Sequence, residues 1–284
     1  MRPNPTDLNS LAQRAADIQL VVADLDGTLL LPDKTLPAGF AALMERMAAA
    51  GVRFVPGSGR QLQTLEDMFG PWGASMPIIA ENGANVGIDG TSIATTFLPA
   101  RVAYRAVSIL RTLNTRAAPV GIIYCGEDAA YAELNNPEFV KESLAYYHAN
   151  RVVDDLLALP GGAFKIAAYD FADPATHILP ALEELRGLAD VTQSGQHWVD
   201  INPRDASKGR AIAVVQEHFG ITPAQTVAFG DFHNDISMFS RADLSFAMAN
   251  AHPDVLAAAR YIAPMNSEAG VVRTVNGLLD LAGR

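Results

Sequence analysis

The chain has a single cysteine, Cys125, among its 284 residues. One cysteine cannot form a disulfide within the chain, so nothing in the sequence requires an oxidising compartment. Cys125 ends the apolar, β-branched run Val120-Gly-Ile-Ile-Tyr-Cys, which is typical of a buried strand. A free cysteine in such a run usually behaves as a small hydrophobe. We therefore interpret Cys125 as a core residue and not as a catalytic nucleophile.

Long hydrophobic runs and positive charges are also scarce. No apolar run approaches the ~18–20 residues that span a bilayer, and residues 1–16 lack the apolar stretch of a signal peptide. Lysine and arginine number 21 against 31 acidic residues, which gives a formal net charge of −10. Such a surface repels nucleic-acid phosphates and anionic lipid, so we expect neither as a partner. We expect a soluble, cytoplasmic protein, and no oligomeric state is indicated.

Apolar residues make up 49% of the chain and charged residues 18%, which is enough for a substantial core. Near both ends, short β-branched runs alternate with stretches of helical spacing, which predicts a doubly wound, Rossmann-like α/β sheet. Residues 8–17 can form a short leading helix. Residues 86–196 mix candidate strands and helices, and no strand there ends in an acid comparable to Asp24. We predict a core of residues 1–85 and 197–284 and an inserted α+β cap of residues 86–196.

The first candidate motif is Asp24-Leu-Asp-Gly-Thr-Leu29, directly after the predicted strand 18–23. Asp24 and Asp26 can point into one site if the chain turns as it leaves the strand, and Gly27 permits that turn. The alternative is that Asp26-Gly27 is only a turn signal. Because ligands bind beyond the carboxyl ends of strands in open α/β sheets, we take both acids as candidate site residues.

The second candidate motif is Gly230-Asp-Phe-His-Asn-Asp235, again after a predicted strand. Its carboxylate and amide oxygens are ligands that suit Mg²⁺. Alternatively, Asp231 or Asn234 caps the helix that follows. We interpret His233 as a loop side chain, because no second histidine or cysteine lies near it in the sequence.

Two weaker candidates lie at predicted helix starts. The glycines of Gly57-Ser-Gly-Arg60 let backbone N–H groups approach an anion, and a helix follows at once. Lys208 begins another predicted helix after Ser207. Each has an ordinary explanation on its own, since a lysine near a helix end is usually a solvated charge.

In this order the four motifs resemble those of the haloacid dehalogenase superfamily, in its Cof-like branch with a type IIB cap. The resemblance extends over nearly the whole chain after residue 18. It includes four further segments, Glu81-Asn-Gly-Ala84, Val199-Asp-Ile-Asn-Pro203, Met248-Ala-Asn-Ala-His-Pro253 and Asn266-Ser-Glu-Ala-Gly-Val271. One departure is Ser58, where threonine is at least as usual in the family, although the hydroxyl is kept.

The resemblance implies a magnesium-dependent phosphatase that works through an aspartyl-phosphate. Asp24 is then the nucleophile, and Asp26 is the acid that protonates the leaving group and the base that activates water. The implied Mg²⁺ ligands are Asp24, the backbone carbonyl of Asp26, and Asp231, with Asp235 supporting the metal shell from behind.

The resemblance also implies phosphate-binding roles for Ser58, Gly59, Lys208 and Asn234. The implied substrate is a small phosphorylated metabolite, a sugar phosphate or a related phosphomonoester. Two alternatives stay open: a phosphomannomutase-like phosphotransferase, and a non-catalytic binding or regulatory protein with the same fold. The intact pair of Asp24 and Asp26 argues against the second, because losing either acid would be its simplest signature.

Overall fold

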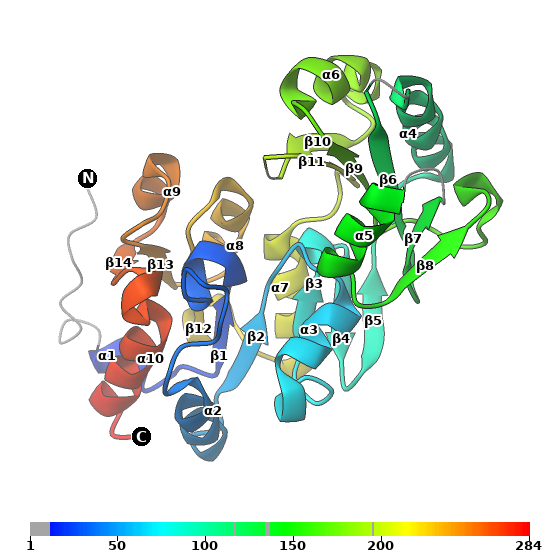
Figure 1. Ribbon diagram of the computed structural model, residues 1–284. Helices are drawn as coiled ribbons and strands as arrows, with labels where there is room; N and C mark the ends of the chain where they lie inside the picture. The colour runs from blue at the N-terminus through cyan, green and yellow to red at the C-terminus, as the bar shows by residue number, and fades with distance from the viewer. Residues whose placement is uncertain (1–11, 116–117, 134–136, 195) are drawn as a thin grey trace. The chain divides into compact units, whose positions relative to one another are not determined.

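The computed structural model describes residues 12–115, 118–133, 137–194 and 196–284 (Figure 1). The expected helix at residues 8–17 lies partly outside this range, and a short helix α1 covers Ala12–Ala15. None of the described helices is both long and apolar enough to cross a membrane. The chain forms two compact units. The core unit comprises Met1–Gly59, Phe69–Ile93 and Ser207–Arg284, and the inserted unit comprises Arg60–Met68 and Ala94–Ala206.

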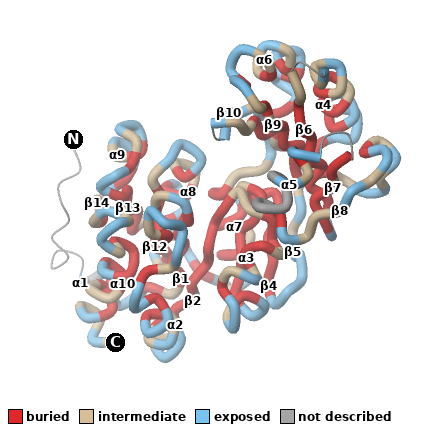
Figure 2. Tube along the Cα trace, in the orientation of Figure 1, coloured by how far each residue is buried: buried red, intermediate tan, exposed pale blue. Residues whose placement is uncertain are grey.

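A five-stranded parallel sheet forms the centre of the core unit, in the order β14-β13-β12-β1-β2. The strands are β1 (Leu20–Ala23), β2 (Arg53–Pro56), β12 (Thr226–Gly230), β13 (Leu244–Met248) and β14 (Tyr261–Ala263). Every residue of β1, β12 and β13 is buried, which explains their continuous apolar sequence (Figure 2). The predicted doubly wound α/β fold is confirmed, and β1 lies inside the sheet with Asp24 at its carboxyl end.

Helices cover both faces of this sheet (Figure 1). One group consists of α1, α2 (Phe40–Ala49) and α10 (Gly270–Leu281), which contact one another through α10. The other consists of α7 (Lys208–Phe219), α8 (Ile236–Phe239) and α9 (Pro253–Ala258), which contact one another through α8. Helix α8 is short, because a 3₁₀ turn at His233–Asp235 precedes it.

A second, three-stranded sheet belongs mainly to the core unit. It contains β3 (Ile78–Ala80), β4 (Asn85–Ile88) and β5 (Thr91–Thr95), in that order. Strand β3 pairs antiparallel with β4, and a single parallel bridge from Gly57 to Ile79 connects it to the end of β2. The main partner of β3 is therefore the strand that follows it, and not a strand of the five-stranded sheet.

The inserted unit is built on a six-stranded sheet in the order β10-β11-β9-β6-β7-β8. Its strands are β6 (Val120–Cys125), β7 (Ala130–Glu133), β8 (Asn150–Val153), β9 (Lys165–Asp170), β10 (Asp190–Gln193) and β11 (Trp198–Asn202). Neighbours pair antiparallel, except β7 and β8, which are parallel. Cys125 is buried, as expected for a core thiol.

The helices of the inserted unit are α3 (Leu62–Met68), α4 (Ala100–Leu113), α5 (Pro137–Tyr146) and α6 (Pro174–Ala181). Helices α4 and α6 contact each other and the sheet, and their apolar side chains join those of β6, β9 and β11 in one core. On α5, Phe139 is fully buried and packs where a side chain at Gly121 would otherwise lie. The unit therefore has a hydrophobic core of its own.

The limits of the inserted unit differ from the range 86–196 suggested by the sequence. Strand β4 stays with the core unit because it pairs with β3, whereas β11 pairs with β9 and carries the inserted unit on to Ala206. Helix α3 also belongs to the inserted unit. There, the backbone N–H of His148 donates to Thr64 Oγ1 at 3.4 Å. Sequence patterns indicate strands but not their partners, and the partners determine where a domain begins.

The approach of Gly83 to the start of α7 yields a stability prediction. Gly83 has φ +95°, and a Cβ there would overlap the backbone carbonyl of Ser207. Gly51 is a matched control, because its φ is +69° but nothing lies within 4 Å of its Cβ position. Gly51→Ala should cost only the left-handed backbone strain, about 1–2 kcal/mol. Gly83→Ala should cost a further ~1–3 kcal/mol for the overlap.

Urea unfolding of both variants would measure this difference. The midpoint of Gly83→Ala should lie clearly below that of Gly51→Ala, at an unchanged slope. Equal midpoints would show that the backbone at Ser207 moves aside without cost.

Candidate active site

Asp24 lies where β1 ends. Its backbone N–H donates to the carbonyl of Phe229 at 3.0 Å, which continues the pairing with β12 by one residue. The chain then turns at Gly27, with φ +84°. A Cβ at Gly27 would overlap the carboxylate of Asp231. Glycine is therefore required where the first motif approaches the second.

The loop after β12 folds tightly around Asp235. The Oδ2 atom of this fully buried side chain accepts the backbone N–H groups of Asp231 at 2.9 Å and Phe232 at 3.1 Å. A Cβ at Gly230 would overlap Asp235. Across the site, Thr28 Oγ1 donates to Asp231 Oδ1 at 2.8 Å. These bonds hold Asp231 at its backbone N–H and at its carboxylate.

Lys208 joins the two motifs. It is the first residue of α7, whose N-terminus is capped by the Ser207 hydroxyl, and its side chain is 0% exposed. Its Nζ lies 2.5 Å from Asp24 Oδ1 and 2.7 Å from Asp235 Oδ1. Burial alone would lower the pKa of Lys208, but Asp235 and Asp24 outweigh burial and hold that pKa above its ordinary value. The lysine is therefore a buried cation between two carboxylates.

Three carboxylates gather here, and we call Asp24, Asp231 and Asp235 the acid cluster. One oxygen from each lies within 4.8 Å of the others. Burial raises the pKa of Asp24 well above its ordinary value, Asp235 and Asp231 raise it further, and Lys208 opposes them. Burial also raises the pKa of Asp231, against the hydrogen bond from Thr28.

The charge balance of the acid cluster suits a cation. Lys208 supplies one positive charge against three carboxylates, and burial together with the neighbouring carboxylates raises the pKa of both Asp24 and Asp231. Carboxylate oxygens are the ligands that hard divalent ions such as Mg²⁺ prefer. The residues present therefore fit a site for such an ion.

Asp26 lies apart from the acid cluster. Its side chain is 42% exposed, and its Oδ1 accepts a hydrogen bond from Lys34 Nζ at 2.8 Å. Lys34 has a positive φ of 68° on the loop after the first motif. No pattern in the sequence singled out Lys34, because a lysine in a polar loop usually faces only solvent. The structure thus gives the candidate acid–base residue a cationic neighbour.

The candidate phosphate-binding residues are connected through Asn82. The backbone carbonyl of the buried Ser58 accepts the backbone N–H of Asn82 at 2.9 Å. A Cβ at Gly59 would press on the Asn82 side chain. Asn234 Nδ2 donates to Asn82 Oδ1 at 3.1 Å. In the sequence, Asn82 stands out only as part of the Glu81-Asn-Gly-Ala84 motif. In the structure it links the loop after β2 to the loop after β12.

Two asparagines from the late motifs hold the turn after β1. Asn250 Nδ2 donates to the carbonyl of Gly27 at 2.8 Å. Asn266 Nδ2 donates to the carbonyl of Leu30 at 2.8 Å, and its backbone N–H donates to Asn250 Oδ1 at 3.0 Å. These two asparagines therefore hold the turn that follows the candidate nucleophile.

Comparison with known proteins identifies chains of similar sequence and fold. Residues 21–275 match the family model of the haloacid dehalogenase-like hydrolases. A 5-amino-6-(5-phospho-D-ribitylamino)uracil phosphatase of Escherichia coli is 32% identical over 265 residues, which cover 92% of this chain and 96% of that protein.

Solved structures agree with this match. A protein from Thermotoga maritima superposes with a TM-score of 0.79 and 26% identity, over 91% of this chain and 97% of the other. A sugar phosphatase of subclass IIB of the superfamily shares the fold, with a TM-score of 0.73 and 21% identity over 91% and 98% of the two chains.

The repulsion within the acid cluster predicts that Asp24→Asn stabilises the metal-free protein. The folded-state pKa of Asp24 lies above the unfolded value, so the folded state binds the proton more tightly. Its charge therefore destabilises the fold increasingly as pH rises above the unfolded pKa. In excess chelator at neutral pH, the variant should gain about 1 kcal/mol, or roughly 2–4 °C in melting temperature.

Asp33→Asn is the matched control for this measurement. Hydrogen bonds from Thr35 lower the pKa of Asp33, so removal of its charge should not stabilise the protein. The advantage of Asp24→Asn should shrink toward acidic pH, where Asp24 of the wild type is protonated. A variant that is less stable than wild type at neutral pH would mean that Lys208 outweighs the repulsion.

Proposed function

Because the chain belongs to the haloacid dehalogenase-like hydrolases, we propose that it is a phosphatase of the Cof-like branch with a type IIB cap, and that it hydrolyses a phosphomonoester through an aspartyl-phosphate on Asp24. The observation that carries the proposal is the buried Lys208, which contacts Asp24 at 2.5 Å and Asp235 at 2.7 Å beside Asp231. This arrangement orients one carboxylate and surrounds it with groups that can neutralise a phosphoryl group.

In the first step, a carboxylate oxygen of Asp24 forms a bond to phosphorus, and the bond from phosphorus to the leaving oxygen breaks. Lys208 holds Asp24 Oδ1 in place and offsets negative charge as the phosphoryl group approaches. Asp26 gives its proton to the leaving oxygen. Its exposed position next to Lys34 leaves it within reach of substrate entering from solvent.

In the second step, a water oxygen attacks the phosphorus of the aspartyl-phosphate. Asp26, now a carboxylate, takes the proton from that water, and the bond from phosphorus to the Asp24 oxygen breaks. Inorganic phosphate leaves, and both acids return to their starting states. The same residue serves as acid and then as base, so no further proton carrier is needed.

Two members of the acid cluster, Asp24 and Asp231, would hold Mg²⁺ together with the backbone carbonyl of Asp26. Asp235 supports this set, because it accepts the backbone N–H of Asp231 and contacts Lys208. A bound Mg²⁺ would supply the positive charge that lets a carboxylate and a phosphate dianion approach each other.

The phosphoryl oxygens would contact Lys208 and three groups on the neighbouring loops. Ser58 and Gly59 lie just after β2, and Asn234 is positioned by its hydrogen bond to Asn82. The network through Asn82 favours a common role for these loops, because it holds their polar groups in a defined arrangement.

For the substrate, we propose a small metabolite such as a sugar phosphate or a related phosphomonoester, selected by the inserted unit acting as a cap. Support comes from the Escherichia coli relative, which is named for a phosphorylated ribitylamino compound. Initial rates on a panel containing that compound, sugar phosphates and nucleotides test the proposal. The preferred substrate should have a far higher kcat/KM than the rest, and nucleotides should rank low.

Metal dependence is the first test of the chemistry. The purified protein should hydrolyse an aryl phosphate with Mg²⁺ and lose that activity in excess chelator, because the acid cluster repels a phosphate dianion when no cation is bound. Readdition of Mg²⁺ should restore the rate. Undiminished turnover in chelator would rule out the role given to the acid cluster.

Acid-quenched protein distinguishes the roles of the two catalytic acids. Asp24→Asn should trap no phosphate and show no turnover, because an amide is a poor nucleophile. Asp26→Asn should lose ~10²–10⁴-fold or more in turnover of alkyl phosphates, whose leaving groups need a proton. With an aryl phosphate it should accumulate phosphorylated protein, because the base for the second step is absent.

Asp33→Asn is the control for Asp26→Asn, since Asp33 is an exposed acid on the same loop that bonds Thr35. It should keep normal turnover. Phosphate trapped on Asp24→Asn, or normal alkyl-phosphate turnover by Asp26→Asn, would contradict the assigned roles.

A further inference from the structure

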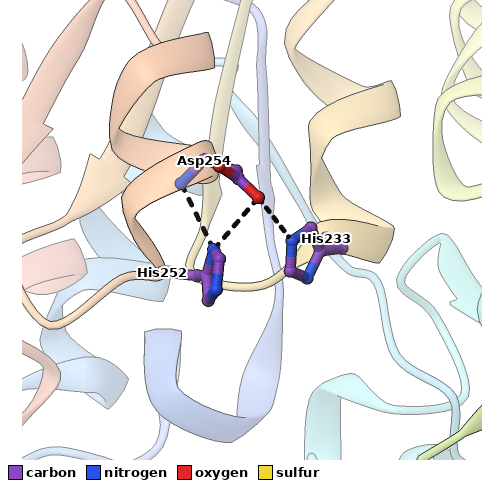
Figure 3. Close-up of side chains that lie close together, drawn as sticks. All are labelled: His233, His252 and Asp254. Carbon is purple, nitrogen blue, oxygen red and sulfur yellow. Dashed lines mark hydrogen bonds and ion pairs between the residues drawn. The ribbon is translucent and has the colours of Figure 1, made fainter.

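His233, His252 and Asp254 converge on one point beside the candidate active site (Figure 3). His233 lies in the turn after β12, His252 lies between β13 and α9, and Asp254 lies in the first turn of α9. Strands β12 and β13 are paired neighbours, so the segments that follow them lie together. The backbone N–H of His252 also donates to the carbonyl of Asp231 at 2.9 Å.

This convergence changes the interpretation of His233. No histidine lies near it in the sequence, yet in the structure the His252 ring centroid is 4.2 Å away. Figure 3 shows the Asp254 carboxylate directed at both imidazoles. His233 Nε2 lies 3.0 Å from Asp254 Oδ2, and His252 Nδ1 lies 3.5 Å from the same oxygen.

These separations suit a tetrahedral ion. Bonds of about 2.0–2.1 Å from Zn²⁺ to nitrogen and oxygen place tetrahedral ligands about 3.3 Å apart. The two measured separations fall on either side of that value, and all three donor atoms lie within 4.8 Å of one another. Small side-chain rotations would bring them onto a common centre.

The donor atoms are also oriented. The backbone N–H of Asp254 donates to His252 Nδ1 at 3.2 Å, so this nitrogen carries no proton, and an ion that binds there would take its lone pair from that hydrogen bond. His233 Nε2 faces Asp254 Oδ2 directly, at the place where an ion could replace the shared proton. Both imidazoles therefore present a nitrogen toward the carboxylate before any ion arrives.

The chemistry of the donors selects the kind of ion. Two imidazoles and one carboxylate suit Zn²⁺ and similar transition-metal ions, whereas Mg²⁺ prefers the all-oxygen acid cluster. The Phe232 ring lies 4.9 Å from the His233 ring and 6.0 Å from the His252 ring, so apolar surface borders the two imidazoles. The side chains stay partly exposed, which leaves room for a water or an anion as fourth ligand.

We propose that His233, His252 and Asp254 form a second metal site, which takes Zn²⁺ or a similar transition-metal ion with one position open. The site would fasten the turn that carries Asp231 and Asp235 to the start of α9. It is independent of the catalytic roles proposed above, because none of its side chains belongs to the acid cluster.

Zinc binding to protein without an affinity tag tests the site. A chromophoric chelator competes for Zn²⁺ in saturating Mg²⁺, which keeps the acid cluster occupied. Wild type should bind one equivalent that Mg²⁺ does not displace. His233→Gln, His252→Gln and Asp254→Asn should each weaken that binding at least ~10-fold, since even residues behind a metal ligand are typically worth that much.

His218→Gln is the matched control, because His218 is an exposed histidine on α7, and it should bind Zn²⁺ like wild type. Co²⁺ gives a second readout, since a tetrahedral site with two histidines absorbs visible light far more strongly than octahedral Co²⁺. The three site variants should lose that absorbance. Wild-type binding equal to that of the site variants would overturn the proposal and leave the cluster as an ion pair between Asp254 and the two histidines.

Discussion

The buried contact of Lys208 with Asp24 and Asp235 is the interaction on which the site depends. A lysine that is fully removed from solvent stays charged only if carboxylates compensate it, and these two come from the ends of neighbouring strands β1 and β12. Removing the lysine from such a group typically costs about 3–5 kcal/mol, because the buried carboxylates are left without their cation. The ion pair thus ties the start of α7 to the centre of the sheet.

Neutral side chains complete the site around this charged centre. Asn82, Asn250 and Asn266 each join loops that are far apart in sequence, and amides can donate and accept at once. Because amides carry no charge, they hold these loops together without altering the balance between Lys208 and the three carboxylates. Glycines at positions 27 and 230 leave room for the side chains of Asp231 and Asp235.

Sequence patterns predicted that Asp24 and Asp231 lie close together, for a topological reason. Asp24 and Asp231 each follow an apolar run, and β1 and β12 are adjacent in the parallel sheet, so the two acids meet at one edge. Partners that depend on loop paths were not predictable in the same way. Lys34 reaches Asp26, and Thr28 reaches Asp231, through turns whose course no local spacing encodes. His252 was missed as a neighbour of His233 for the same reason, because two strand ends bring them together.

The close approach of Gly83 to Ser207 brings together the two segments that flank the larger part of the inserted unit, Ala94–Ala206. For this part, the chain leaves the core unit after Ile93 and returns at Ser207. With these flanks already in contact, the polypeptide between them is a closed loop, and doubling its length would add only about 0.6 kcal/mol of closure entropy. An insert of another size or sequence could therefore occupy this place while the acid cluster stays unchanged. The inserted unit is thus the part of the molecule whose length and sequence can change with little effect on the acid cluster.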